Sequence, residues 1–409
     1  MEIKEIAKKI ENNGGRLYLV GGAVRDKILR KACYDEDYCV VGLNSSSFLE
    51  LFPMAKMDGK AFPVFRMFGS EFALARKEKK IGVGHKEFEV ISGKEITLKE
   101  DLERRDITIN AMAEDVLTGE IFDYFGGKED LKNGIIRAIG SHFKEDPLRV
   151  YRVARFSSVL GFKVEEKTIL MMNELKEELK YLSKERVFGE FRKALASKKP
   201  STFFSVLKKA DVLDVHFKPI YKLIGALQPE KYHPEGDSYN HTMICLDKSA
   251  KITTDLKIRY SVLVHDLGKG ETPKEEYPHH YGHEERGVEI VRKFSHDLGV
   301  PNAWKKCGIV AAKEHMRGGI FNKMKPSKKV EFIERIDKTY LGLEGLQIVV
   351  DCDKGGRIED DIDFSSIGKK CLEEVTAGKV AKKYKLKPGI ELGRKLHEER
   401  VTWIKHLTK

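Results

Sequence analysis

The stretch YLVGGAVRDKILRKACYDEDYCVVG, residues 18–42, decides the fold of the first part of this 409-residue chain. Its two apolar ends are typical of buried strands, and between them lie a glycine pair, a helical segment and an acidic segment. Gly21 and Gly22 carry no side chain, so a ligand can approach the backbone closely, and N–H groups at a helix start receive anionic oxygens. The pattern predicts a phosphate-binding turn between a strand and a helix.

Charged side chains accompany this turn. Arg25 lies in the first turn of the predicted helix, where its guanidinium can reach the same phosphates. Asp35 and Asp37 are two residues apart and leave one face of the predicted strand, and Glu71 can add a third carboxylate from a neighbouring strand. Paired carboxylates repel unless a cation neutralises them, and Mg²⁺ prefers carboxylate and phosphate oxygens. We therefore expect Mg²⁺ at Asp35 and Asp37, between an attacking hydroxyl and a nucleoside triphosphate, with Glu71 as a further catalytic residue.

The composition is typical of a soluble, globular protein of several domains. Hydrophobic residues make up 41% and charged residues 34% of the chain, and no stretch approaches the roughly 18 apolar residues of a membrane span. The amphipathic start is not a signal peptide. Six cysteines without a CxxC pair predict reduced thiols and a cytoplasmic location. The net charge of +11 favours a polyanionic partner, and we expect no membrane contact.

Periodicity divides the chain into parts of different class. Residues 1–140 alternate short apolar strands with helices, whereas the remainder has the periodicity of long helices. We therefore predict an α+β protein, with a small mixed α/β head followed by an all-helical neck, body and tail. The predicted domains are the head at 1–140, a helical neck at 141–228, a further helical domain at 229–340 and a helical tail with a basic end at 341–409.

Four motifs occur in the order of a known family. VGGAVRD at 20–26 is followed by DED at 35–37, RRDITINAMA at 104–113 and EDPLRVYRVARF at 145–156. In this order they resemble the motifs of the class II tRNA nucleotidyltransferases, the CCA-adding enzymes of the polymerase-β nucleotidyltransferase superfamily. Bacterial poly(A) polymerases are close relatives of that family. A basic, glycine-containing stretch at 73–90 is similar to the flexible loop of complete CCA-adding enzymes.

The resemblance implies roles for the matching residues. Asp35 and Asp37 would hold the catalytic metals of a nucleotidyltransferase head. The residues that would border the triphosphate and ribose are Arg104, Arg105, Asp106 and Asn110. A structural account of the same motif stays open, in which two basic residues cap a helix and Ile107, Ala111 and Met112 belong to the core.

The fourth motif offers a way to choose between bases. Asp146 followed by Pro147 is typical of a helix start, and Arg149 and Arg152 follow at three-residue spacing. The Watson–Crick edges of cytosine and adenine both combine an amino donor with a ring-nitrogen acceptor. An ionised Asp only accepts and an Arg only donates, so this pair matches C and A and opposes U and G. In the resembled family the matching residues act as such a template. The alternative is a surface ion pair worth about 0.2–0.5 kcal/mol.

Residues with metal-ligand chemistry lie in the helical part. The adjacent pair His265 and Asp266 follows an apolar run, with a histidine 24 residues before it and an aspartate 87 residues after it. This pattern resembles the HD phosphohydrolase superfamily, so we expect the domain at 229–340 to be an HD domain. The residues predicted for its site are His241, His265, Asp266, His283, His315 and Asp353. Imidazole and carboxylate ligands suit a divalent metal, Ni²⁺, Co²⁺, Mn²⁺ or Mg²⁺, that activates water.

The combination of such a head with an HD domain resembles the multifunctional CCA proteins. We therefore predict an enzyme that adds CCA to tRNA 3′ ends from CTP and ATP. The resemblance also implies 2′,3′-cyclic phosphodiesterase, 2′-nucleotidase or phosphatase activity. The alternatives are a poly(A) polymerase, a partial CC- or A-adding enzyme, and an HD phosphohydrolase with a nucleotide-sensing head. We expect a monomer or a homodimer.

Overall fold

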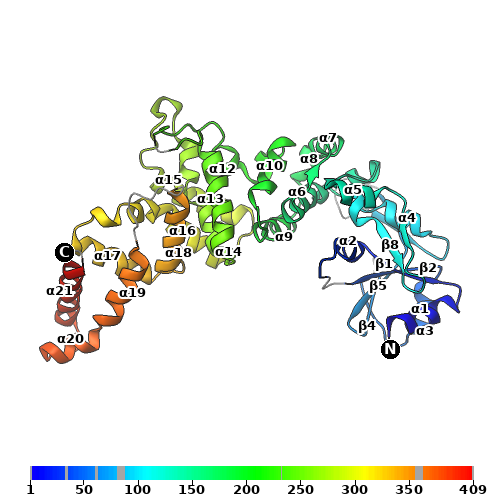
Figure 1. The fold of residues 1–409 in the computed structure, drawn as a ribbon, viewed down its shortest axis with the longest axis horizontal. Coiled ribbons are helices and arrows are strands. Elements are labelled where there is room, and N and C mark those ends of the chain that lie inside the picture. Colours follow the sequence, from blue (N-terminus) through cyan, green and yellow to red (C-terminus); the bar gives the residue numbers. More distant parts are fainter. Residues whose placement is uncertain are drawn as a thin grey trace. The chain divides into compact units, whose positions relative to one another are not determined.

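The structure, a computed structural model, describes residues 2–32, 36–59, 63–80, 88–231, 233–354 and 363–407. The chain forms two compact units, one of Met1–Glu190 with Thr202–Val212 and the other of Phe191–Ser201 with Leu213–Lys409. Figure 1 shows a sheet with helices in the first unit and an assembly of helices in the second. The predicted α+β class, with a mixed head followed by helical parts, is confirmed.

The elements up to Lys209 are α1 (Ile3–Glu11), β1 (Arg16–Val20), α2 (Gly22–Ile28), β2 (Asp37–Val41), α3 (Ser45–Leu51), β3 (Lys56–Asp58), β4 (Val64–Met67), β5 (Ser70–Leu74), β6 (Arg76–Lys80), β7 (Phe88–Ser92), α4 (Leu98–Glu103), η1 (Thr108–Asn110), β8 (Met112–Asp115), β9 (Ile121–Asp123), α5 (Gly127–Asn133), β10 (Ile135–Ile136), η2 (Ser141–Glu145), α6 (Leu148–Leu160), β11 (Lys163–Val164), α7 (Glu166–Glu174), α8 (Lys176–Leu179), α9 (Lys184–Leu195) and α10 (Ser201–Lys209).

The elements that follow are α11 (Leu213–His216), α12 (Lys218–Tyr221), α13 (Ser238–Ile252), α14 (Leu256–Val264), η3 (Leu267–Glu271), η4 (Lys274–Glu276), α15 (His283–Asp297), α16 (Asn302–Gly319), η5 (Phe321–Lys323), α17 (Pro326–Asp337), α18 (Gly342–Asp353), α19 (Phe364–Glu374), α20 (Ala377–Tyr384) and α21 (Ile390–Leu407).

A mixed sheet organises the first unit. Among the described residues it contains seven strands in the order β3-β4-β5-β2-β1-β8-β9. β1 pairs antiparallel with β2 and β8, and β2 runs parallel to β5. The strands expected at the two ends of the opening stretch are β1 and β2. Of the stretch at 73–90, β6 and β7 form an antiparallel hairpin, and residues 81–87 lie outside the described residues.

Each face of this sheet packs on helices, because successive side chains of a strand point to opposite faces. On one face Leu17 of β1 packs in a core with Ile6 of α1 and Phe48 of α3. On the other face Tyr18 packs in a core with Leu102 of α4. Figure 1 shows α1 and α3 close together near the N-terminus. The sheet is therefore buried on both faces, and polar residues gather at the ends of its strands.

The template helix begins slightly later than the sequence predicts. α6 starts at Leu148, with Pro147 at the N-cap position, one residue after the expected start. Asp146 still acts on the helix end, because its Oδ1 accepts a hydrogen bond from the Leu148 N–H at 3.0 Å. The proline ring fixes its own φ and so favours the turn that leads into the helix.

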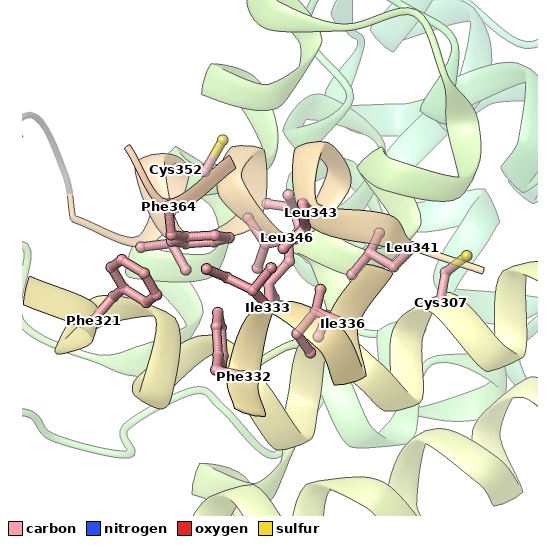
Figure 2. Close-up of a cluster of buried hydrophobic side chains, with 14 of the residues drawn as sticks. Cys307, Phe321, Phe332, Ile333, Ile336, Leu341, Leu343, Leu346, Cys352 and Phe364 are labelled. Carbon is pink, nitrogen blue, oxygen red and sulfur yellow. The ribbon is translucent and has the colours of Figure 1, made fainter. Parts of the chain in front are cut away.

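The second unit buries an extensive core between α14, α16, α17, α18, α19 and α21 (Figure 2). Three aromatic rings, those of Phe321, Phe332 and Phe364, contact one another with centroids 5.3–5.7 Å apart. Cys307 and Cys352 belong to the same core, and the five described cysteines are all buried and free. None of the helices in the described part of the chain combines the length and the apolar character that a membrane span requires.

Candidate active sites

A cavity of about 500 Å³ in the first unit collects the residues that sequence analysis assigned to nucleotide binding. All ten of them line it: Gly21, Gly22, Arg25, Arg104, Arg105, Asp106, Asn110, Asp146, Arg149 and Arg152. Asp37 lines it as well. Seven arginines and three aspartates face this space, so its charge suits a polyphosphate.

The backbone favours glycine at the first position of the pair, and arginine side chains lie close to both positions. Gly21 has φ +73°, a left-handed conformation that favours glycine, and a Cβ there would lie 2.8 Å from Arg105 Nη1. A Cβ on Gly22 would lie 3.3 Å from Arg25 Nη2. Two arginine side chains therefore pass directly over the turn between β1 and α2.

These arginines are held in place by acidic and amide groups. Arg25 donates through Nε and Nη2 to the two carboxylate oxygens of Asp26, each at 2.9 Å, and through Nη1 to Asn110 Oδ1 at 2.6 Å. Asp101, 1% exposed, accepts from Arg104 Nη2 at 2.7 Å and from Arg105 Nη2 at 3.4 Å. Burial alone would raise the pKa of the Asp101 carboxyl, but attraction to Arg104 and Arg105 outweighs burial and lowers it. An ionised, buried carboxylate thus orients two of the predicted phosphate-binding groups.

A second buried carboxylate connects the third motif with the template helix. Asp106 Oδ2 accepts from Arg152 Nε at 2.7 Å, and Asp106 Oδ1 lies 3.4 Å from Asn110 Nδ2. Burial alone would raise the pKa of Asp106, but the Arg152 charge outweighs it and lowers that pKa. Ile107, whose burial the structural account of this motif predicts, is fully buried. The motif therefore serves the core and the cavity together.

The two residues of the predicted base template have partners outside their own helix. Asp146 Oδ2 accepts from Arg186 Nη2 of α9 at 2.8 Å. Arg149 donates through Nη2 to the Arg104 carbonyl at 2.5 Å and through Nη1 to the His142 carbonyl. Arg149 is only 7% exposed, so the alternative of a surface ion pair does not describe it.

The predicted catalytic carboxylates lie at the ends of two neighbouring strands. Asp37 of β2 and Glu71 of β5 are partners in the parallel register, and both line a cavity of about 200 Å³. Glu71 Oε1 accepts from Arg66 Nε at 2.8 Å. Asp35 lies outside the described residues.

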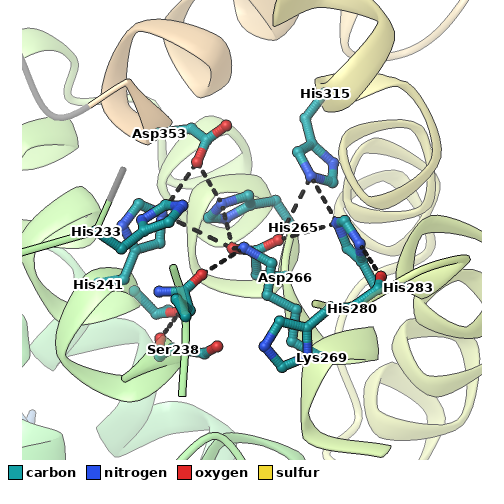
Figure 3. A network of polar contacts seen from close by, with 12 residues as sticks. His233, Ser238, His241, His265, Asp266, Lys269, His280, His283, His315 and Asp353 are labelled. Carbon is teal, nitrogen blue, oxygen red and sulfur yellow. Dashed lines mark hydrogen bonds and ion pairs between the residues drawn. The ribbon is translucent and has the colours of Figure 1, made fainter. Parts of the chain in front are cut away.

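In the second unit, residues from five helical segments converge on the predicted HD site (Figure 3). His241 comes from α13, His265 and Asp266 from the end of α14, His283 from the start of α15, His315 from α16 and Asp353 from the end of α18. Two groups of possible ligands result, one of His241, His265, Asp266 and Asp353 and one of Asp266, His283 and His315, and each has its donor atoms within 4.8 Å of one another. Asp266 belongs to both groups.

Backbone carbonyls fix the orientation of three of these imidazoles. His265 Nδ1 lies 2.7 Å from the Val262 carbonyl oxygen, His283 Nδ1 2.8 Å from that of His280, and His315 Nδ1 2.9 Å from that of Ala311. Because a carbonyl only accepts, each Nδ1 donates its proton to it, and Nε2 is the ring nitrogen that faces the cluster. His283 Nε2 and His315 Nε2 lie 3.2 Å apart, so two potential ligand atoms face each other.

A cation bound here would balance the carboxylates and join the imidazole nitrogens that meet in this cluster. His265 Nε2 and both Asp266 oxygens are buried without a hydrogen bond of regular geometry, although Lys269 Nζ lies 2.6 Å from Asp266 Oδ2. The closest donor atoms within each group are separated by 3.0–3.8 Å. Ligands bound at about 2.0–2.2 Å around a tetrahedral ion lie roughly 3.3–3.6 Å apart. The donor set and its spacing therefore fit divalent metal ions.

The pKa values show how strongly the cluster attracts positive charge. Burial alone would lower the pKa of His265, but Asp266 and Asp353 outweigh burial and raise it to about 10. Burial would likewise lower the pKa of His241, but hydrogen bonds to Asp353, Cys245 and Glu235 raise it to about 12. Protons and metal ions compete for such positions, because an imidazole ligand binds metal in its neutral form.

Several residues of these sites were not predicted from the sequence. Arg76 and Arg186 line the nucleotide cavity, and Asp101 orients its arginines. A spacing of three and four residues from Asp101 to the two arginines is the local signal that could have found it. Lys269 and Glu235 contact the HD cluster. Of the histidines near it, His280 has a structural role, since its ring contacts Thr272 Oγ1 and the Leu227 carbonyl, each at 2.9 Å.

Models of known families match three successive parts of the chain. The poly A polymerase head domain matches residues 17–137, the probable RNA and SrmB-binding site of polymerase A matches 161–223, and the HD domain matches 238–341. The multifunctional CCA protein of Nitrosococcus oceani is 41% identical over 325 residues, covering 78% of this chain and 79% of that protein. That of Vibrio parahaemolyticus is 40% identical over 351 residues, covering 84% and 86%.

Solved structures share the fold. A CCA-adding enzyme in complex with ATP superposes with a TM-score of 0.66 at 20% identity, over 99% of this chain and 90% of that one. The Thermotoga maritima CCA-adding enzyme complexed with tRNA superposes with a TM-score of 0.66 at 19% identity, over 99% and 94%.

Fold, cavity and metal cluster define a polymerase-type nucleotidyltransferase head joined to an HD domain. The identity over most of the length of its relatives then places the chain more closely: it belongs to the family of multifunctional CCA proteins.

Proposed function

We propose that this protein adds C and A to the 3′ ends of tRNA from CTP and ATP, and that its HD domain hydrolyses phosphate esters with a divalent metal. The observation that carries the first activity is the gathering of all ten predicted nucleotide-binding residues around one cavity. The names of the relatives agree with it, since they are multifunctional CCA proteins at about 40% identity.

Within the cavity, the arginines would bind the triphosphate. Arg25, Arg104 and Arg105 lie around the glycine turn, where the backbone leaves room for phosphate oxygens. Asp35 and Asp37 would hold Mg²⁺ with help from Glu71, since carboxylate oxygens are its preferred ligands. Bound there, Mg²⁺ would stabilise the charge that develops on the transferred phosphoryl group.

Asp146 and Arg149 would select the base, and Arg152 lines the same cavity. The Asp146 carboxylate only accepts, and in this structure Arg186 supplies a donor to it. The amino group of a cytosine or an adenine would compete for that acceptor, whereas the carbonyl of a uracil or a guanine would be left facing another acceptor. Because this pair also matches adenine, the experiment below separates the enzyme from a poly(A) polymerase, which uses ATP alone.

The second activity rests on the imidazole–carboxylate cluster. His241, His265, Asp266 and Asp353 would hold one divalent ion, and His283 and His315 would share Asp266 for a further position. A metal there supplies an activated water for attack on a phosphate ester. An adjacent cavity of about 410 Å³, lined by Lys269 and Asp353 among others, offers space for that substrate. Ni²⁺, Co²⁺, Mn²⁺ and Mg²⁺ are the candidate ions.

The remaining expectations follow from this proposal. A tRNA partner accounts for the basic net charge, and the free thiols fit a cytoplasmic location. We retain the division into a head at 1–140, a neck at 141–228, an HD domain at 229–340 and a basic helical tail at 341–409. We also retain the expectation of a monomer or a homodimer.

One experiment tests the nucleotidyltransferase activity directly. The protein is incubated with Mg²⁺, a tRNA that ends at the discriminator base, and each labelled triphosphate alone and in combination. We expect two additions from CTP and a third only when ATP is also present. Addition of A residues alone in a long tail would instead favour a poly(A) polymerase, and a single kind of addition a partial enzyme.

A further inference from the structure

Glu235 connects two imidazoles beside the HD cluster. Its Oε1 lies 2.6 Å from His241 Nδ1 and 2.9 Å from His233 Nδ1. The other nitrogen of His241, Nε2, lies 3.0 Å from Asp353 Oδ1. The rings of His233 and His241 meet edge to face with centroids 4.7 Å apart, and Figure 3 shows them side by side near Asp353. Glu235 therefore contacts His241 at the ring nitrogen opposite the one that faces Asp353.

The loop that carries Glu235 is fixed by backbone hydrogen bonds. Gly236 follows it with φ +95°, a conformation suited to glycine, and its carbonyl accepts from the Gln228 N–H at 3.1 Å. Asp237 then caps α13, with Oδ1 accepting from the Asn240 N–H and Oδ2 from the Gly225 N–H, each at 2.8 Å. The carboxylate of Glu235 is thus presented from a defined turn directly before the helix of His241.

The chemistry of the contact sets the proton position on His241. A carboxylate oxygen only accepts, so His241 donates its Nδ1–H to Glu235, and Nε2 is the ring nitrogen left to bind a metal once it has lost its proton. Carboxylates in this position orient metal-binding histidines and raise their basicity, and removing one typically costs 10–100-fold in metal affinity.

We propose that Glu235 is a positioning residue, which holds His241 in the tautomer and orientation needed to bind the divalent metal of the HD site. The inference rests on the metal site proposed above. His233 shares the same carboxylate oxygen and lines the adjacent cavity, so in this proposal it supports Glu235.

The test is a Co²⁺ titration of the metal-free full-length protein, followed by the visible absorption of the bound ion. We compare wild type with Glu235→Ala, Glu235→Gln, His233→Ala and the control Glu230→Gln, an exposed carboxylate in the same loop. We expect Glu235→Ala to weaken Co²⁺ binding by roughly 10–100-fold and Glu235→Gln by less, since an amide oxygen still accepts. His233→Ala and Glu230→Gln should bind Co²⁺ with an affinity within about threefold of wild type. The fluorescence of Trp304 and Trp403, which both belong to the second unit, reports that each variant is folded.

The possible results distinguish a positioning role for Glu235 from a ligand role and from the absence of a metal site. Unchanged Co²⁺ affinity and spectrum in folded Glu235→Ala or Glu235→Gln would overturn the positioning role while leaving the metal site intact. A second result would also overturn the positioning role: Glu235→Ala binds one Co²⁺ fewer per chain, and the remaining ions bind with unchanged affinity. Glu235 would then be a metal ligand together with His233 and His241. A wild-type protein that binds no Co²⁺, Ni²⁺ or Mn²⁺ would refute the proposed metal site itself.

Discussion

Asp37 and Glu71 are direct partners in the parallel register of β2 and β5, so their carboxylates leave the sheet at the same level. Both are exposed, and Arg66 lies 2.8 Å from Glu71. A parallel pair brings residues together that are 34 positions apart in the sequence (71 − 37). This placement supports Glu71 as a third carboxylate beside the proposed metal ligands.

Removal of Asp37 should abolish nucleotide addition with the fold retained. A metal at the transferred phosphate contributes several kcal/mol, so we expect Asp37→Ala to lose about a thousandfold in kcat/KM. Glu71→Ala should lower kcat/KM by less than Asp37→Ala does. The control is Asp58→Ala, an exposed carboxylate of the same sheet that is ion-paired with the same Arg66. Addition by Asp37→Ala within a few-fold of wild type would contradict the assignment.

Loss of Asp146 should relax base choice more than it weakens triphosphate binding. An acceptor buried against the wrong base costs about 1–3 kcal/mol, which corresponds to roughly 5- to 150-fold in discrimination. We expect Asp146→Ala to raise incorporation from UTP and GTP relative to CTP by a factor in this range, with a smaller change in KM for CTP. The control Glu185→Ala removes an exposed carboxylate from α9. If UTP is excluded by Asp146→Ala as strongly as by wild type, base choice depends on other residues.

The two activities should be separable by mutation. His265→Ala, or Asp266→Asn, which keeps the side-chain shape, should abolish hydrolysis of a 2′,3′-cyclic nucleotide or a simple phosphate ester. Addition of C and A to tRNA should persist in both variants, because no HD residue lines the nucleotide cavity among the described residues. His296→Ala, whose ring is exposed in the same unit, is the matched control. A wild type without phosphohydrolase activity under Mg²⁺, Mn²⁺, Ni²⁺ and Co²⁺ would refute the second activity.

Local sequence patterns predicted the helices and strands better than the contacts between side chains that are far apart in the sequence. The apolar runs in RLYLV and DYCVV identify β1 and β2, because both strands are buried on the two faces of the sheet. The three-residue spacing of Arg149 and Arg152 correctly indicated a helix, whereas Asp146 lies just before it. It could not show that Arg186, 40 positions later, would supply a donor to Asp146.

The HD cluster shows the same limit of prediction from local sequence patterns. The adjacent pair His265 and Asp266 marks the site because an apolar helix has no structural need for it. Glu235 and Lys269 carry no comparable signal, since a carboxylate in a loop and a lysine after a glycine are ordinary surface residues. Only the packing of α13, η3 and α18 places these charges against the cluster.

The stability of the second unit should decline in mild acid through His216. Burial lowers the pKa of this imidazole to about 4, from an ordinary value of 6.5. Between these values the unfolded chain binds a proton that the native state does not, so unfolding becomes more favourable as the pH falls from 6.5 to 4. Above pH 6.5 the imidazole is neutral in both states, and its contribution is constant.

The measurement is urea unfolding at pH 7.5, 6, 5 and 4, followed by tryptophan fluorescence. Both tryptophans, Trp304 and Trp403, lie in the second unit, so the signal reports that unit alone. His216→Gln removes the titration, and wild type should therefore lose on the order of 1 kcal/mol more than this variant between pH 6.5 and 4. His296→Ala, an exposed histidine, should show the pH dependence of wild type. A constant difference between wild type and His216→Gln across these pH values would show that His216 titrates alike in both states.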